Sequence, residues 1–141
     1  MTTRILLAEM RLPFPPSVNH IWLHSSERVY SADDSKRYKA LVKQLALLNG
    51  RGDTKEYYIR IFRKPEPKTR LKVRACFFCP DNRKRDLDNL PKVVFDGMTE
   101  AKLWTDDSQI FEMHTLKYLK RDYTSLPTKG RVEMQVYGDF E

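Results

Sequence analysis

Apolar residues recur along the chain with two different periods, which together predict strands and helices. Residues 4–12 are mostly apolar and end at Pro13, so they predict a first strand. Ser31 is a suitable N-cap for a second element, a helix that ends at Asn49 and Gly50. The apolar stripe of this helix has a helical spacing and consists of Tyr38, Leu41, Val42, Leu45 and Leu48.

Four further segments have the composition of strands. Residues 56–63 and 70–79 come first, and the second of these stops at Pro80. Residues 109–119 and 131–137 follow near the end of the chain. In the 70–79 segment apolar residues alternate with polar ones, which predicts a buried face made of Leu71, Val73, Ala75 and Phe77.

A second helix is predicted between these strands, over residues 88–102. Asp88 or Asn89 can cap it, and Pro91 is tolerated in the first helical turn. Its buried stripe is expected to consist of Leu90, Val94, Gly97, Met98 and Ala101.

The order of these elements indicates one domain over residues 1–141. The chain has 141 residues, which suits a single domain with its own hydrophobic core. The order strand, helix, two strands, helix, two strands predicts an α/β fold, bordering on α+β, with a mixed β-sheet and two main helices.

Charge and composition narrow the range of partners. The chain carries 26 basic and 19 acidic residues, a net charge of +7, which favours a polyanion such as nucleic acid although many basic soluble proteins bind none. The N-terminus lacks a long apolar core of the signal-peptide type, and no run of about 18 apolar residues occurs. We therefore expect a cytoplasmic protein that does not associate with membranes.

The two cysteines, Cys76 and Cys79, are interpreted as reduced structural residues. Three positions apart on a strand they face opposite sides, so a disulfide between them is awkward. A zinc site would need two further ligands, for which His20 and His24 are the nearby candidates.

Acidic residues cluster around the second predicted helix. Asp86 and Asp88 follow an apolar strand and, in a strand conformation, would point to the same face. Asp106 and Asp107 form a second acidic pair after the helix. Clustered carboxylates are suited to Mg²⁺, which takes hard oxygen ligands and is usually held by one or two carboxylates together with substrate phosphates.

Basic residues accompany this acidic cluster. Arg83, Lys84 and Arg85 form a run suited to phosphate, and Lys92 stands one helical turn after Asp88. Bound Mg²⁺ activates water and polarises a phosphoryl oxygen, while a fixed cation such as Lys92 stabilises charge in the transition state. Metal-holding acids beside phosphate-holding bases suggest metal-assisted cleavage of nucleic acid.

A structural alternative explains part of the same pattern. Asp88, Lys92 and Asp96 are spaced four residues apart and could form a ladder of exposed ion pairs, each worth tenths of a kcal/mol. Such a ladder would not account for Asp86 or for the adjacent basic run.

Residues 83–107 resemble the signature of the RusA family of Holliday junction resolvases. The resemblance is carried by R-D-L-D-N-L-P-K, F-D-G-M-T and W-T-D-D, by an early F-P-P-S-V-N-H and by a late T-K-G-R-V-E. It implies a RusA-like fold and a homodimeric, Mg²⁺-dependent endonuclease that nicks opposing strands of a four-way DNA junction. Such enzymes act in DNA recombination and repair and are often of prophage origin.

The same resemblance implies roles for individual residues. Asp86, Asp88 and Asp107 are expected to be catalytic metal ligands, Lys92 a catalytic cation and Arg85 a DNA contact. Asp106 is expected to hydrogen-bond locally or to support Asp107, Asn19 to brace the proline-rich loop or form a turn, and Trp104 to be a core residue that positions Asp107.

Two other functions are compatible with these residues. One is a metal-dependent nuclease for different branched or single-stranded nucleic acid, and the other is a nucleic-acid-binding protein without catalysis.

Overall fold

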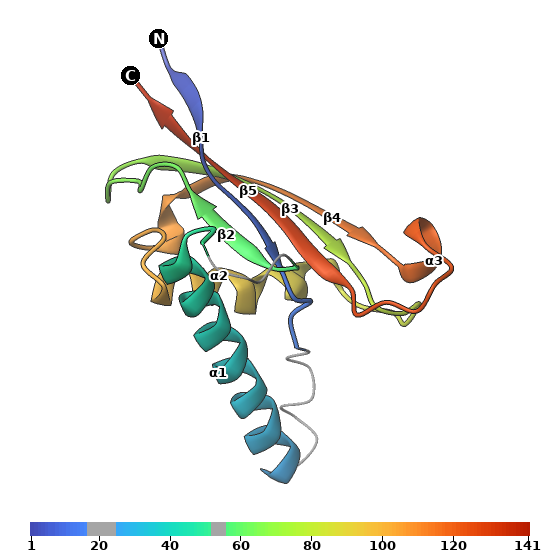
Figure 1. Cartoon of the computed structure of the whole chain (residues 1–141). Helices are drawn as coiled ribbons and strands as arrows, with labels where there is room; N and C mark the ends of the chain where they lie inside the picture. Colours follow the sequence, from blue (N-terminus) through green and yellow to red (C-terminus); the bar gives the residue numbers. More distant parts are fainter. Residues whose placement is uncertain (17–24, 52–55) are drawn as a thin grey trace.

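The computed structural model describes residues 1–16, 25–51 and 56–141, with the side chains of residues 25–32 left undescribed. Within these residues the strands form one five-stranded sheet in the order β2-β1-β5-β3-β4 (Figure 1). Asn19, His20 and His24 lie outside the described residues. The strands are β1 (Thr3–Leu12), β2 (Tyr58–Ile61), β3 (Arg70–Phe78), β4 (Ile110–Tyr118) and β5 (Arg131–Phe140).

The sheet is mixed, as the order of elements predicted. β3 and β4 run parallel, whereas β1 pairs antiparallel with both β2 and β5, and β5 pairs antiparallel with β3. The crossover between the parallel strands contains the second helix, as parallel pairing requires. Because β1 and β5 are antiparallel partners, the two ends of the chain lie close together (Figure 1).

Helices α1 (Ser25–Leu48) and α2 (Leu90–Glu100) lie on the same side of the sheet (Figure 1). The predicted stripe of α1 is buried at Tyr38, Val42 and Leu45. Gly97 of α2 faces Val42, and a Cβ atom at Gly97 would lie 3.4 Å from the valine side chain. The glycine therefore allows the two helices to pack closely.

The face predicted for β3 is confirmed. Leu71, Val73, Ala75 and Phe77 are each no more than 1% exposed and belong to the core beneath the two helices. Alternation was informative here because only one face of this strand is covered, so each apolar position reports the covered side.

Several element boundaries differ from the predictions. Helix α1 begins at Ser25, so Ser31 lies inside it, because residues 25–31 contain no glycine or proline that would stop the helix. Leu48, in the last turn of α1, is 36% exposed, so this position of the predicted stripe is not buried. Strand β2 is shorter than predicted and β5 is longer. The predicted 88–102 helix is a 3-10 turn at Leu87–Asn89 followed by α2.

One short helix, α3 (Lys120–Tyr123), was not predicted. It follows β4 and occupies part of a segment that looked like a loop, because four residues are too few to show a period. Among the helices in the described part of the chain, none is both long and apolar enough to cross a membrane.

Candidate active site

Asp86 and Asp88 lie in a turn and not in the strand conformation that would point both to the same face. Strand β3 ends at Phe78, Asp86 is the extended residue that precedes the 3-10 turn, and Asp88 lies within that turn. The strand stops before Pro80, as predicted, because Pro80 and the polar residues after it give no apolar face to pair with the sheet. The two aspartates nevertheless share one cavity of about 700 Å³, which Lys84 and Lys117 also line.

Asp86, Asp88 and Lys92 are exposed and, within the described part of the chain, make no side-chain hydrogen bond or ion pair. Lys92 lies in the first turn of α2. The predicted ladder of Asp88, Lys92 and Asp96 is therefore not formed among the described residues. This leaves two exposed carboxylates whose oxygens are available to a hard cation, and an exposed lysine available to a phosphate.

The basic loop, residues 81–85, is ordered by an aspartate that the sequence did not single out. Asp81 accepts hydrogen bonds from Arg85 Nη1 at 2.7 Å and from Arg85 Nη2 at 3.1 Å. It also accepts from the Arg83 backbone N–H and from Arg83 Nε, both at 3.0 Å. The end of the Arg85 guanidinium is thus held by both carboxylate oxygens, a geometry that fixes its plane.

This pairing changes the pKa values of both partners. The hydrogen bonds from Arg85 hold the pKa of Asp81 well below its usual range, and those bonds in turn raise the pKa of Arg85. Burial raises the pKa of the nearby Cys79 thiol. Both Cys76 and Cys79 are free thiols.

Contacts from three other segments also hold the basic loop. The Arg85 guanidinium carbon lies 5.2 Å from the centre of the Phe14 ring, and Lys117 Nζ donates to the Arg85 carbonyl at 2.5 Å. From α3, the Lys120 backbone N–H donates to the Asp81 carbonyl at 3.2 Å. Because the Arg85 side chain is only 18% exposed, it is presented in one orientation rather than many.

Asp107 is held by the turn after α2. Its Oδ1 accepts from Thr99 Oγ1 at 2.6 Å and from Trp104 Nε1 at 2.8 Å. Trp104 is 2% exposed and packs edge-on against Phe95, with ring centroids 5.7 Å apart. The prediction that Trp104 is a core residue that positions Asp107 is confirmed.

Asp106 bonds locally, which was one of its two predicted roles. Its side chain accepts from the Ser108 N–H at 3.0 Å, and Gln109 accepts from the Asp106 N–H, so the two residues form a capping box. Gln109 also donates to the carbonyls of Glu66 and Thr69 and thereby ties the turn to the segment before β3.

The donor set fits a hard divalent cation only in part. Among the described residues, no three Asp, Glu, His or Cys side chains gather closely enough to hold a metal ion together. Asp86 and Asp88 do line one cavity, and Mg²⁺ usually needs one or two carboxylates besides water and phosphate. The structure does not bring Asp107 into one group with them.

Sequence reasoning missed three residues that shape the site. Asp81 stands four residues before Arg85, a spacing that could have suggested the pair, although the loop is not helical. Lys117 and Thr99 carried no local signal, because Lys117 reaches the site through the β3–β4 pairing and Thr99 through the fold of the turn after α2.

A small α/β domain with exposed carboxylates beside ordered arginines suits the class of proteins that bind and cleave phosphodiesters. Residues 13–136 match the family model described as Endodeoxyribonuclease RusA. The chain belongs to this family, which confirms the resemblance seen in the sequence.

Named relatives agree with the family match. The crossover junction endodeoxyribonuclease RusA of Escherichia coli K12 is 31% identical over 106 residues, which are 75% of this chain and 78% of the relative. The RusA protein of Enterobacteria phage 82 is 30% identical with the same shares, and that of Enterobacteria phage HK97 is 29% identical over 109 residues, which are 77% and 81% of the two chains.

Proposed function

We propose that this protein is a Mg²⁺-dependent, structure-selective endodeoxyribonuclease that resolves four-way (Holliday) DNA junctions by paired symmetric nicks. The observation that carries the proposal is the single cavity that Asp86 and Asp88 line without partners among the described residues, next to the ordered Arg85. Family membership and the names of the relatives, which are crossover junction endodeoxyribonucleases, support this reading.

The acidic residues are proposed as metal ligands. Asp86 and Asp88 would hold Mg²⁺, and Asp107 is proposed as the third acid. The ion, when bound, supplies polarisation of the phosphoryl oxygen and lowers the pKa of a water molecule. Lys92, exposed at the start of α2, is proposed to stabilise the charge that develops on the phosphate or on the leaving oxygen.

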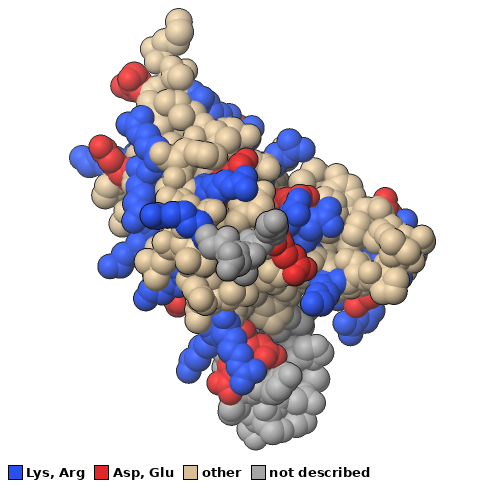
Figure 2. Space-filling view, viewed as in Figure 1, with Lys and Arg blue, Asp and Glu red and all other residues tan. Residues whose placement is uncertain are grey.

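DNA binding is proposed for Arg83, Lys84 and Arg85. Asp81 takes one hydrogen from each terminal nitrogen of Arg85, so the guanidinium keeps further N–H donors from which a phosphate can accept. Lys and Arg side chains are spread over the face seen in Figure 2, with acidic groups among them, so the phosphate backbone would meet positive charge over a wide area.

We further propose a homodimer as the working form. A four-way junction presents two equivalent strands for cutting, and a two-fold dimer supplies two matching sites. Light scattering is expected to give twice the mass of the 16.7 kDa chain. A monomer that retains paired nicking at the same micromolar concentration would contradict this.

A nicking assay tests the proposed function. The substrates are a synthetic four-way junction, a linear duplex and single strands, each incubated with Mg²⁺ or with EDTA. We expect paired nicks in the junction alone and only with the metal. Cleavage of other branched or single-stranded DNA would favour a different nuclease, and binding without any cleavage would favour a non-catalytic nucleic-acid-binding protein.

A further inference from the structure

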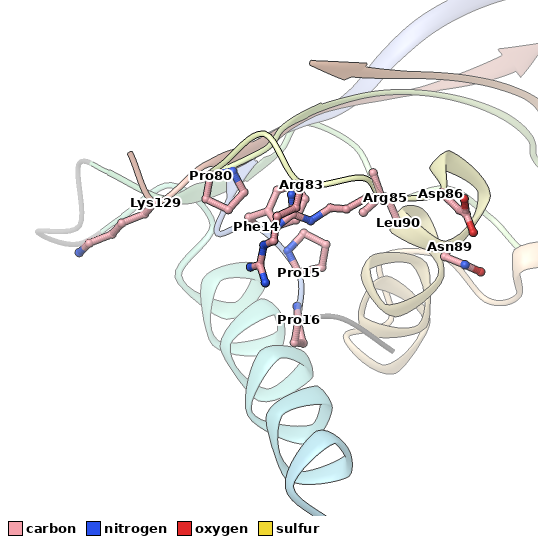
Figure 3. Close-up of a pocket in the computed structure, with 10 residues that line it drawn as sticks. All are labelled: Phe14, Pro15, Pro16, Pro80, Arg83, Arg85, Asp86, Asn89, Leu90 and Lys129. Atoms are coloured by element: carbon pink, nitrogen blue, oxygen red, sulfur yellow. The ribbon is translucent and has the colours of Figure 1, made fainter. Parts of the chain in front are cut away.

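A second, smaller cavity lies between the proline-rich segment after β1 and the basic loop. Its volume is about 290 Å³. Figure 3 shows the Arg83 and Arg85 side chains beside Phe14 and Pro15, with Asp86 towards one end and Lys129 at the other. The early proline-rich motif and the later basic loop, far apart in the sequence, therefore build one site.

The walls of this cavity have two chemical characters. Phe14, Pro15, Pro80 and Leu90 provide an apolar surface. Arg83, Arg85 and Lys129 provide three cations, against the carboxylate of Asp86 in the wall and that of Asp81, which pairs with both arginines. An apolar surface next to clustered cations suits a ligand with a flat, weakly polar part and an anionic part, and a nucleotide has both.

The side chains around the cavity are held before any ligand arrives. Arg85 is fixed by Asp81 and lies near the Phe14 ring. The Tyr38 hydroxyl of α1 donates to the carbonyl of Pro13 at 2.7 Å and so anchors the segment that carries Phe14. A preformed site loses less side-chain entropy on binding.

Asp86 connects this cavity to the larger one. It lines both, whereas Asp88 lines only the larger cavity among those described. A nucleotide whose phosphate lies at Asp86 and Asp88 would therefore have the neighbouring nucleotide of the same strand next to the smaller cavity.

The size of the cavity restricts what can enter. Its volume of about 290 Å³ lies at the lower limit of small-molecule pockets, which span roughly 300–1,000 Å³, so it suits one nucleotide better than a base pair. The nucleotide must then leave its stack, which costs least where pairing and stacking are already disturbed. In a four-way junction that place is the point at which the strands exchange.

We infer that the cavity lined by Phe14, Arg83, Arg85 and Lys129 binds one unstacked nucleotide of the DNA strand, directly adjacent to the scissile phosphate. This inference rests on the proposed function and extends it, because it gives a physical reason for selecting branched over linear DNA. A linear duplex would have to break a complete stack to fill the same site, whereas the junction offers a loosened one.

Junctions with 2-aminopurine at successive positions around the exchange point test this inference, because the fluorescence of that base rises when it unstacks. The protein is added in EDTA, so that no strand is cut. We expect a several-fold rise at one position per cut strand, adjacent to the nick that is mapped separately with Mg²⁺. The rise should be lost in Phe14→Leu, with melting temperature and far-UV circular dichroism confirming that this variant is folded.

Lys129→Gln provides a second, surface variant, and Lys68→Gln is its matched control, because both lysines are exposed and only Lys129 lines the cavity. Lys129→Gln should reduce the slope of log binding constant against log salt by about 1 per contacted phosphate, and Lys68→Gln should leave it unchanged. A junction that is nicked without any position-specific rise, or a rise that Phe14→Leu leaves intact, would overturn the nucleotide site alone. A protein that never nicks the junction would instead contradict the proposed function.

Discussion

The loops at the two ends of α2 both carry acidic residues, but the side-chain hydrogen bonds of these acids differ between the two loops. After the helix, Asp107 is held by two neutral donors, Thr99 Oγ1 and Trp104 Nε1. Before the helix, the acid with the hydrogen bonds is Asp81, which orders arginines, while Asp86 and Asp88 have no such partner among the described residues.

This difference indicates which groups are prepared in advance and which are left to a ligand. Arg85 and Asp107 occupy fixed positions in the absence of DNA, so their ordering entropy is lost during folding. The unpaired carboxylates of Asp86 and Asp88 repel each other until a cation joins them. We therefore expect substitutions at the unpaired acids to affect cleavage alone, and substitutions at the held groups to affect cleavage and stability together.

The largest effect is expected for Asp86→Asn and Asp88→Asn. Each keeps the shape of the side chain but removes a charge that would hold Mg²⁺, so junction nicking should fall to background. Binding in EDTA should stay equal or become tighter, because an acid that opposes the phosphate backbone has been removed. Single-turnover nicking and a gel-shift titration measure the two effects.

Asp107→Asn belongs to the same series and asks whether the loop after α2 contributes to the metal site. We expect it to abolish cleavage as well, and also to lower stability, because Asp107 is hydrogen-bonded and the other two acids are not. Asp96→Asn, which changes an aspartate within α2, is the control and should retain substantial activity. If all three central variants cut normally, the two loops do not form a metal site.

Lys92→Ala should reduce the cleavage rate by about 100-fold while hardly changing affinity for the junction. One lysine among many phosphate contacts adds little to binding, but a cation at the developing charge can contribute on the order of 3 kcal/mol to the transition state. Lys102→Ala, which removes an exposed lysine just beyond α2, is the matched control. Normal cleavage by Lys92→Ala would leave this lysine without a role in the reaction.

Thr99→Val should lower the cleavage rate by about tenfold at saturating DNA, because a hydrogen bond to a charged group is worth about 1.5 kcal/mol. This variant removes a donor to Asp107 and keeps the shape of the side chain. Thr105→Val is the control, because Thr105 is exposed in the same turn and its hydroxyl makes no hydrogen bond among the described residues. A purely structural role would lower the melting temperature and leave the rate unchanged.

The sequence allowed the sheet to be predicted and singled out the acids around α2 as candidates, because both depend on local pattern. Alternation in β3 and the helical stripe of α2 report burial directly. The partners of the acids could not be predicted in the same way. Thr99 meets Asp107, and Lys117 meets the Arg85 carbonyl, only after distant segments have packed.

The conformation of Asp86 and Asp88 could not be fixed from the sequence for a related reason. A polar loop after a strand has no apolar period, so the spacing of two acids alone does not distinguish a strand from a 3-10 turn. Asp81 was overlooked because its importance depends on bidentate geometry with Arg85, which spacing does not show.

The smallest expected effect concerns the pair that orders the basic loop. Asp81→Asn should lower the free energy of unfolding by about 1 kcal/mol at pH 7, a modest value because the Asp81 side chain is 35% exposed and solvent screens the pair.

Since the pKa of Asp81 is depressed in the folded protein, the unfolded chain binds the proton more readily. The contribution is therefore complete well above the unfolded pKa of about 4 and is lost progressively as the pH falls from there through the lower pKa of the folded protein. Urea denaturation at pH 7, 5 and 3.5 should show the gap between wild type and Asp81→Asn narrowing at the lowest pH, with exposed Asp33→Asn as the control. A gap that stays constant across this range would mean that the Asp81 charge does not stabilise the loop, and Arg85 would then owe its order to Phe14 and Lys117.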